Sequence, residues 1–342
     1  MRGSICFLTP VAVWCTVLVA VLGAGAQDTT ILVGSGSSVP APLYARWAQE
    51  YNQHNSHIQF KYLPTATREG VEQISKGSGD FGAGEVPLAA QDRDQAGLTE
   101  IPVALVAIVP VYNLPGVKSG LRLSGEVLAG IFLGEIKNWS SAAITKLNPD
   151  MALPDAAIRV VYRPAGKGSN YVFTDFLSKT SAKFKARVGT TPSPKWPVGE
   201  AAERSSDMAD MVNREMGAIG YVELAYAMKS GLSQAAVLNP AGKFVKASAA
   251  SITAACRDVE DPRWDRFSAS LTNAPGEDAF PISSFTWAYL RTSGGDASRE
   301  LAVQEFFSWI FADGQSLAEQ EGYPPLPTQL LVAVRGKMKE IH

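Results

Sequence analysis

The chain has 342 residues, with 31 basic and 33 acidic side chains, a formal net charge of −2, three cysteines and three histidines. A near-neutral chain without a long basic run argues against nucleic acid as a partner. The histidines lie at positions 54, 57 and 342, away from every Gly/Ser-rich motif. The sequence therefore offers no base for a Ser-His-Asp hydrolase and no metal-ligand spacing, and we expect neither cofactor nor metal.

Residues 1–26 have the pattern of a cleaved secretory signal peptide. Arg2 precedes an apolar run over residues 5–22, and an A-x-A site ends at Ala26. The alternative is an uncleaved membrane anchor, because the run approaches the length of a membrane span. A Thr-Pro pair interrupts the run, which favours cleavage. Cys256 would then be the only remaining cysteine, so no intramolecular disulfide is expected.

After this segment, short apolar strands alternate with amphipathic helices, which predicts an α/β fold. Strands are expected over 30–33, 58–62, 102–112, 158–161, 217–222 and 281–290. Helices are expected over 42–51, 71–74, 128–139, 172–177, 301–311 and 330–338, with another beginning at Ser206. The run 102–112 is almost entirely apolar and β-branched, so it predicts a strand buried on both faces of a parallel sheet.

The first strand leads into a loop of small residues, Gly34 to Val39, and then into a helix. This loop lacks the third glycine of a dinucleotide fingerprint and the Gly-Lys-Ser/Thr of a P-loop. A phosphate-cradling loop and a plain turn both fit it. The same order of strand, small polar loop and helix start recurs at 58–74 and at 158–177.

The third of these loops, Arg163 to Ser169, has the residue types of an anion site. Unpaired backbone N–H groups and the positive end of the helix dipole favour a negative ligand at such a helix start. Glycines let the backbone approach a ligand, Ser169 supplies a hydroxyl or an N-cap, and Arg163 supplies a planar fork. The alternative is a capped turn with surface charges.

Five motifs then occur in one order, at residues 34–44, 80–83, 166–169, 217–223 and 276–282. In this combination the chain resembles the phosphate-binding protein (PstS type) of the bacterial ABC phosphate uptake transporter, from about Thr30 to past Pro325. The resemblance implies a periplasmic-binding-protein fold, in which two α/β lobes joined by two crossing segments close around a ligand. It places residues 27–110 and 286–342 in one lobe and residues 111–285 in the other.

The resemblance also implies a set of ligand contacts. They are Ser38 and the backbone of Val39, Thr67, Glu85 as the carboxylate that accepts the ligand's proton, Arg163, Lys167, Gly168 and Ser169. The implied partners are inorganic phosphate and the membrane subunits of an ABC transporter. A monomeric, periplasmic binding protein that is not an enzyme is expected.

Several positions depart from the family pattern. Glu85 stands where the family has Asp, and the extra methylene moves the acceptor by about a bond length. Ala165 stands where an acidic residue is common, so Arg163 loses an orienting partner. Lys167 replaces a Ser and Arg68 a small residue, which makes the cleft more positive. We expect Lys167 to contact the ligand and Arg68 to lie at the rim.

A buried acceptor favours an oxyanion that still carries a proton over a fully ionised one such as sulfate. We therefore predict that Glu85 discriminates phosphate from sulfate. Three alternatives remain open at this stage. Lys167 and Arg68 suit a binding protein for another tetrahedral oxyanion, such as arsenate or a phosphonate. A phosphatase-type enzyme is the second alternative, and a module that reports phosphate to a sensor without delivering it is the third.

Overall fold

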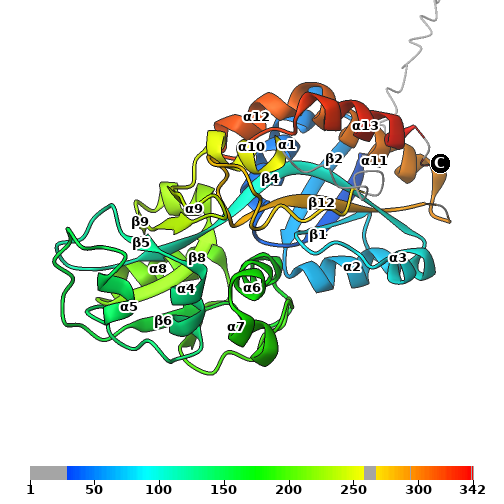
Figure 1. Ribbon diagram of the computed structural model, residues 1–342. Helices are drawn as coiled ribbons and strands as arrows, with labels where there is room; N and C mark the ends of the chain where they lie inside the picture. The colour runs from blue at the N-terminus through cyan, green and yellow to red at the C-terminus, as the bar shows by residue number, and fades with distance from the viewer. Residues whose placement is uncertain (1–28, 258–266, 293, 340, 342) are drawn as a thin grey trace, which may run out of the picture.

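The computed structural model describes residues 29–257, 267–292, 294–339 and 341, so the predicted signal peptide lies outside the described residues. Figure 1 shows two groups of elements connected by the long strand β4 (Leu98–Tyr112). We call the group around strands β1, β2, β3 and β12 the first lobe. The group around strands β6, β7 and β8 is the second lobe.

The first lobe contains β1 (Thr30–Gly36), α1 (Ala41–His54), β2 (Ile58–Pro64), α2 (Thr67–Ser75), β3 (Phe81–Gly84), α3 (Ala90–Ala96), β12 (Ser283–Arg291), α11 (Ala297–Trp309), a π-helical turn (Ile310–Gly314), α12 (Gln315–Gln320) and α13 (Thr328–Met338). The second lobe contains β5 (Arg122–Leu123), α4 (Gly125–Phe132), α5 (Ala142–Thr145), β6 (Arg159–Tyr162), α6 (Gly168–Thr180), α7 (Ala182–Arg187), β7 (Glu200–Ala201), α8 (Ser205–Arg214), β8 (Ala218–Glu223), α9 (Leu224–Lys229), β9 (Ser233–Gln234), β10 (Ala236–Leu238) and β11 (Phe244–Val245). Helix α10 (Ala249–Arg257) packs against β4.

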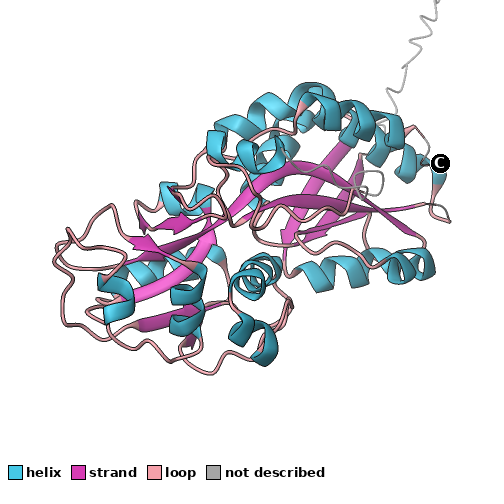
Figure 2. Ribbon diagram, viewed as in Figure 1, coloured by secondary structure: helices cyan, strands magenta, loops and turns pink. Residues whose placement is uncertain are grey.

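One path of paired strands runs through both lobes, in the order β2-β1-β3-β12-β4-β8-β6-β7, and β9 also pairs with β4. Strand β1 is parallel to β2 and β3, and β6 is parallel to β7 and β8. A separate small sheet has the order β11-β10-β5. Figure 2 shows helices on both faces of the strands in the first lobe. Strand β3 and nearly all of β12 are buried there, whereas β2, at the edge of the sheet, keeps several exposed side chains.

Strand β4 serves both lobes. Its residues Leu98–Ala107 pair with β12, and Ile108–Tyr112 pair with β8. Every residue of β4 is buried, as the sequence predicted. The predicted parallel neighbours are wrong, because β4 is antiparallel to both partners. An apolar run indicates only that both faces of a strand are buried. Helices that pack on both faces of a sheet bury its strands whether these are parallel or antiparallel.

Aromatic clusters fix the helices that carry the loops. In the first lobe, Phe60 stacks on Phe306 with ring centroids 3.8 Å apart, and the Trp47 indole of α1 donates to the Gly314 carbonyl at 2.7 Å. In the second lobe, Phe173 of α6 stacks on Tyr221 of β8 with centroids 4.3 Å apart. Buried rings therefore anchor α6 to its sheet and α11 to strand β2, and the Trp47 indole ties α1 to the π-helical turn.

Two helix boundaries differ from the sequence prediction. Helix α4 ends at Phe132 instead of continuing to position 139, because the chain turns at Gly134, where φ is +72°. Helix α8 begins at Ser205 and not at Ser206, and the Asp207 carboxylate accepts the Arg204 N–H at its start. Ser205 is consequently the first residue of α8.

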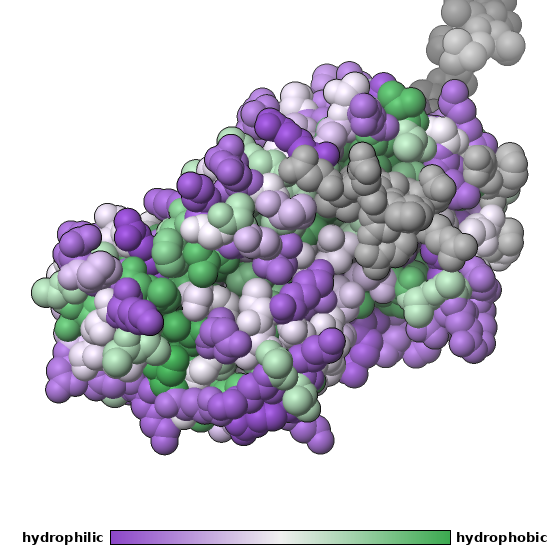
Figure 3. Space-filling model, viewed as in Figure 1, coloured by the Kyte–Doolittle hydropathy of each residue, from purple (hydrophilic) through white to green (hydrophobic). Residues whose placement is uncertain are grey.

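Across the described residues, none of the helices combines the length and apolar character needed to cross a membrane. Polar side chains cover most of the face seen in Figure 3, with small apolar patches between them. The exposed large apolar side chains are scattered over six elements or loops: Ile31, Leu63, Met216, Met228, Leu301 and Val332.

Candidate ligand-binding site

Four helix N-termini meet where the two lobes touch. Helices α1 and α2 start after the first two strands of the first lobe, and α6 and α8 start in the second lobe after β6 and β7. The contact between lobes is direct, since Arg163 Nη2 donates to Ser38 Oγ at 3.2 Å and the Arg68 N–H donates to the Gly166 carbonyl at 3.4 Å. Helix starts present unpaired N–H groups and positive partial charge, so their convergence favours an anion.

Arg163 is the buried cation of this region, with 1 % of its surface exposed. Its Nη1 donates to Ser205 Oγ at 3.0 Å, and its Nη2 donates to Ser38 Oγ and to the Glu203 carbonyl, the latter at 2.7 Å. Its Nε has no hydrogen-bond partner among the described residues. Burial lowers the pKa of Arg163, an effect that the nearby Glu223 carboxylate opposes. The guanidinium therefore has a buried donor left for a ligand.

Glu85 is fully buried at the end of β3. Its Oε2 accepts the Ser37 hydroxyl at 2.6 Å, and its Oε1 accepts the Thr286 hydroxyl at 2.9 Å. Burial raises the pKa of Glu85 to about 8, against the opposing effect of these two hydroxyls. Burial therefore favours the protonated form of Glu85. The discrimination of sulfate by Glu85 stays a prediction, and it requires the ionised carboxyl.

Gly168 shows how closely the lobes meet. A Cβ on Gly168 would lie 2.1 Å from Glu85 Oε2 and 2.7 Å from Thr67 Oγ1. These three residues come from α6, from the end of β3 and from the start of α2, so loops distant in sequence share one small volume. Only glycine fits at this position, and its missing side chain leaves room for the longer Glu85.

Two hydroxyls at helix starts have unused hydrogen-bonding capacity. Thr67 and Ser169 are each 2 % exposed, and neither Oγ has a hydrogen-bond partner within the described chain. Buried polar groups are normally paired, and each exception requires an explanation. Donation to an oxyanion held between α2 and α6 would satisfy both hydroxyls.

The remaining predicted residues have protein partners in this structure. The Val39 N–H donates to Ser37 Oγ at 3.1 Å. Lys167 Nζ lies 3.5 Å from the Thr65 carbonyl of the first lobe and 3.5 Å from a Glu203 carboxylate oxygen of the second. The Arg68 side chain is 63 % exposed, at the rim. Lys167 thus spans the two lobes, and its contact with a ligand stays a prediction.

Sequence reasoning missed four residues of this region: Ser37, Ser205, Glu223 and Thr286. Ser37 and Ser205 each lie next to a serine that the sequence singled out, so a shift of one position would have found them. Glu223 ends the motif at 217–223 and follows an apolar strand, which was a usable signal. Thr286 has no local signal, because strand β12 brings it to Glu85 from 201 positions away.

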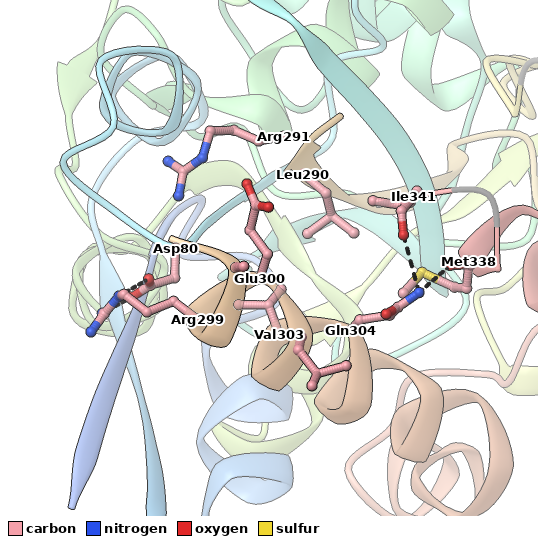
Figure 4. Close-up of a pocket in the computed structure, with 11 residues that line it drawn as sticks. Asp80, Leu290, Arg291, Arg299, Glu300, Val303, Gln304, Met338 and Ile341 are labelled. Carbon is pink, nitrogen blue, oxygen red and sulfur yellow. Dashed lines mark hydrogen bonds and ion pairs between the residues drawn. The ribbon is translucent and has the colours of Figure 1, made fainter. Parts of the chain in front are cut away.

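A cavity in the first lobe is separate from this region. Figure 4 shows it lined by Asp80, Arg299, Glu300 and side chains from the C-terminal end of the chain. In this cavity Arg299 Nη2 lies 2.7 Å from Asp80 Oδ2, the Glu300 carboxylate accepts the Gly295 N–H, and Arg291 Nη1 donates to the Gly79 carbonyl. It contains none of the residues that the sequence assigned to the ligand.

Comparison with known proteins decides the family. A model of the PBP superfamily domain matches residues 23–314. The phosphate-binding protein PstS of Xylella fastidiosa (strain 9a5c) is 38% identical over 87% of this chain and 82% of its own length. PstS of Pasteurella multocida is 36% identical over 97% of this chain and 96% of its own. The chain belongs to the PstS family. The resemblance found in the sequence is therefore confirmed.

Solved structures agree on the fold of this PstS-family chain. A high-affinity periplasmic phosphate-binding protein (PfluDING) superposes with a TM-score of 0.69 at 19% identity, covering 90% of this chain and 93% of its own. An ABC-type phosphate transport receptor from Vibrio cholerae gives a TM-score of 0.57 at 19% identity, covering 86% and 100%. These matches confirm the predicted periplasmic-binding-protein fold.

Proposed function

We propose that this chain captures inorganic phosphate between its two lobes and delivers it to an ABC importer. The observation that carries the proposal is Arg163, which reaches from the second lobe to Ser38 of the first where four helix starts converge. The relatives above are named phosphate-binding proteins, and one structural neighbour is named a phosphate transport receptor. None of these names describes an enzyme, so a binding protein fits better than a phosphatase.

The proposed ligand contacts are the residues that the sequence suggested: Ser38, the Val39 backbone, Thr67, Glu85, Arg163, Lys167, Gly168 and Ser169. Burial of this set supports the assignment, because a dehydrated site strengthens each charge-assisted hydrogen bond. Although Ala165 cannot orient Arg163 as an acidic residue would, the guanidinium has hydrogen-bond partners, because it donates to Ser205 Oγ and to the Glu203 carbonyl.

The proposed mechanism is a proton shared between Glu85 and the ligand. Phosphate has a second ionisation near neutral pH, so it can donate a proton to ionised Glu85 or accept one from the protonated form. Sulfate carries no proton to donate at these pH values. It can therefore bind only when Glu85 itself is protonated, which burial favours below a pKa of about 8.

The division into lobes at 27–110 with 286–342, and at 111–285, is part of the proposal. It is supported by β4, whose pairing changes from β12 to β8 between Ala107 and Ile108. Such a crossing strand can act as a hinge when the lobes separate. We also propose that residues 1–26 are a signal peptide and that the mature chain is a periplasmic monomer, like the periplasmic phosphate-binding protein (PfluDING) named above. The monomer would dock to the membrane subunits of the transporter.

Isothermal titration calorimetry of the mature protein tests this function. Phosphate, arsenate, a phosphonate and sulfate are titrated separately across a range of pH values, and the protein is assayed for phosphatase activity. We expect tight binding of one phosphate per chain and no hydrolysis. Tighter binding of arsenate or of the phosphonate, or turnover of a phosphate ester, would overturn the proposal.

Replacing Lys167 with Met keeps the aliphatic stem and removes the ammonium that links Thr65 to Glu203. We expect phosphate affinity to fall about threefold to tenfold, because a partly screened ionic contact between lobes contributes modestly. Arg68→Met, at the exposed rim, is the matched control and should change affinity less than twofold. Affinity within twofold of the parent in Lys167→Met would remove Lys167 from the proposed ligand contacts.

Replacing Gly168 with Ala places a methyl group 2.1 Å from Glu85 Oε2. We expect phosphate affinity to fall about 100-fold, since overpacking at a closed interface costs about 1–3 kcal/mol and here prevents the lobes from meeting. Gly336→Ala, where nothing lies within 4 Å of the added Cβ, is the control and should bind normally. Unchanged affinity in Gly168→Ala would show that phosphate binds with the lobes further apart.

A further inference from the structure

Glu223 is a buried carboxyl that the proposed ligand set does not use. It ends strand β8, is 1 % exposed, and neither carboxylate oxygen has a hydrogen-bond partner among the described residues. Glu85, by contrast, has a hydroxyl on each oxygen. An unpaired buried carboxylate is costly, so the position of Glu223 requires a reason.

The reason lies in its neighbours. Arg163 is the cation that acts most strongly on Glu223, and the Ser205 hydroxyl beside it is the acceptor of Arg163 Nη1 at 3.0 Å. The other titratable groups acting on Glu223 or Arg163 are Glu85 after β3, Tyr221 of β8, Glu203 before α8, Asp207 in its first turn, Tyr226 of α9 and Tyr323 after α12. Arg204 pairs with Asp207. Among the ionisable groups of this set, Arg163 is the buried cation.

Two buried carboxyls, Glu85 and Glu223, are therefore under the electrostatic influence of one buried guanidinium. Position 165, where an acidic residue is common in the family, is Ala165 in this chain. Glu223, from strand β8, is instead the acidic side chain that acts most strongly on Arg163. When an oxyanion binds beside Arg163, it competes with Glu223 for the same positive charge. Like charges at close range in a dehydrated site repel strongly, so one of them must be neutralised.

We propose that Glu223 is a second proton-carrying carboxyl of the site, which balances Arg163 in the free protein and takes up a proton from the solvent when an oxyanion binds. This inference rests on the proposed function and deepens it, because Glu223 then limits the total negative charge that the closed site accepts. Glu223 acts through Arg163 and is a positioning residue, not a ligand contact. The step involves one proton from the buffer and no covalent change.

The proton balance gives a pH dependence with a definite sign. Burial raises the pKa of Glu223 to about 7, while Arg163 lowers it. A bound oxyanion raises this pKa further by weakening the attraction between Glu223 and Arg163. Between the two pKa values each ligand bound takes up a proton at Glu223, so affinity decreases as pH rises through that range.

The test is phosphate affinity and proton uptake in Glu223→Gln, measured by calorimetry in two buffers of different ionisation enthalpy. Glutamine mimics the protonated form at every pH. We expect affinity within about twofold of the parent at pH 6 and about fivefold or more tighter at pH 8.5, with proton uptake per phosphate reduced. Parallel pH profiles, or an equal loss of affinity at all pH values, would overturn the inference.

Glu203→Gln is the matched control, since it removes one negative charge from an exposed side chain of the same lobe. Its pH profile should parallel that of the parent. If Glu223→Gln fails to fold, Ser205→Ala provides the second test. The Ser205 hydroxyl is near enough to Glu223 to lower its pKa, although no hydrogen bond joins them in this geometry. Its removal should therefore move the fall in affinity to higher pH, and an unmoved midpoint would overturn the inference. A parent protein that does not bind phosphate refutes the proposed function itself.

Discussion

Arg163→Lys is expected to reduce phosphate affinity about 1,000-fold. The guanidinium makes three directed hydrogen bonds within the protein and has a buried Nε free for the ligand. Lysine keeps the positive charge but cannot reproduce the planar fork. Hydrogen bonds that involve a charged group contribute about 1.5–3 kcal/mol each. Two that favour the bound, closed state are lost here, the Nε bond to phosphate and the Nη2 bond to Ser38 of the other lobe, which gives about 4 kcal/mol.

Calorimetry with phosphate measures this loss, and thermal unfolding shows whether the variant is folded. Because lysine still neutralises Glu223, the variant should retain most of its stability. The control is Arg204→Lys, whose side chain is 72% exposed and pairs with Asp207 at the start of α8. Retention of affinity within tenfold of the parent in Arg163→Lys would show that the arginine organises the interface but does not hold the ligand.

Glu85→Gln is expected to reduce the preference for phosphate over sulfate about 100-fold at pH 9. In the parent protein Glu85 is protonated below its pKa of about 8 and ionised above it. Sulfate binding should therefore weaken about tenfold per pH unit above that value, because sulfate cannot supply the missing proton. The glutamine amide donates at every pH, so the variant should lose the part of this decrease that Glu85 causes and keep only the part assigned to Glu223.

The affinity for phosphate should fall about tenfold in the same variant, because the charge-assisted hydrogen bond between phosphate and Glu85 becomes a neutral one. Competition calorimetry of sulfate against phosphate at several pH values measures both effects. Glu100→Gln is the matched control, since Glu100 is also buried with a pKa raised to about 7 but accepts the Leu88 N–H in the first lobe. A sulfate profile in Glu85→Gln that falls with pH as steeply as that of the parent would assign the discrimination to another group.

Local sequence patterns were enough to suggest candidate ligand residues at three helix starts. A loop of small residues between a strand and a helix start was visible at Ser38, Thr67 and Ser169, and the structure brings these helix starts together. The family resemblance then supplied Arg163 and Glu85, which local patterns alone left ambiguous. Helix and strand positions followed from apolar periodicity, with errors of a few residues at the ends of α4 and α8.

Features that depend on distant segments were not predictable. The antiparallel neighbours of β4 come from strands more than 100 positions further along the chain, and apolar composition does not encode strand direction. The hydroxyl from Thr286 reaches Glu85 only because β12 lies beside β3. The direction of the Lys167 side chain depends on Glu203 and Thr65, one from each lobe.

The expected loss of an orienting partner for Arg163 shows the same limit. Position 165 lacks its acidic residue, yet the guanidinium is held by Ser205 from α8 and by the Glu203 carbonyl, with Glu223 as the counter-charge. Ser205 is in position to accept the Arg163 Nη1 donor because it is the first residue of α8. Compensation by neighbours in space cannot be read from a single motif, because it depends on the packing of three segments.

A crystal structure of the mature protein grown with phosphate is the most direct test of how this site works. We predict one tetrahedral density at the meeting point of α1, α2 and α6, with its oxygens in hydrogen-bonding distance of Arg163, Thr67 and Ser169 and one of them sharing a proton with Glu85. Phosphate bound at any other place, or separated from Glu85 by a layer of water, would contradict the account.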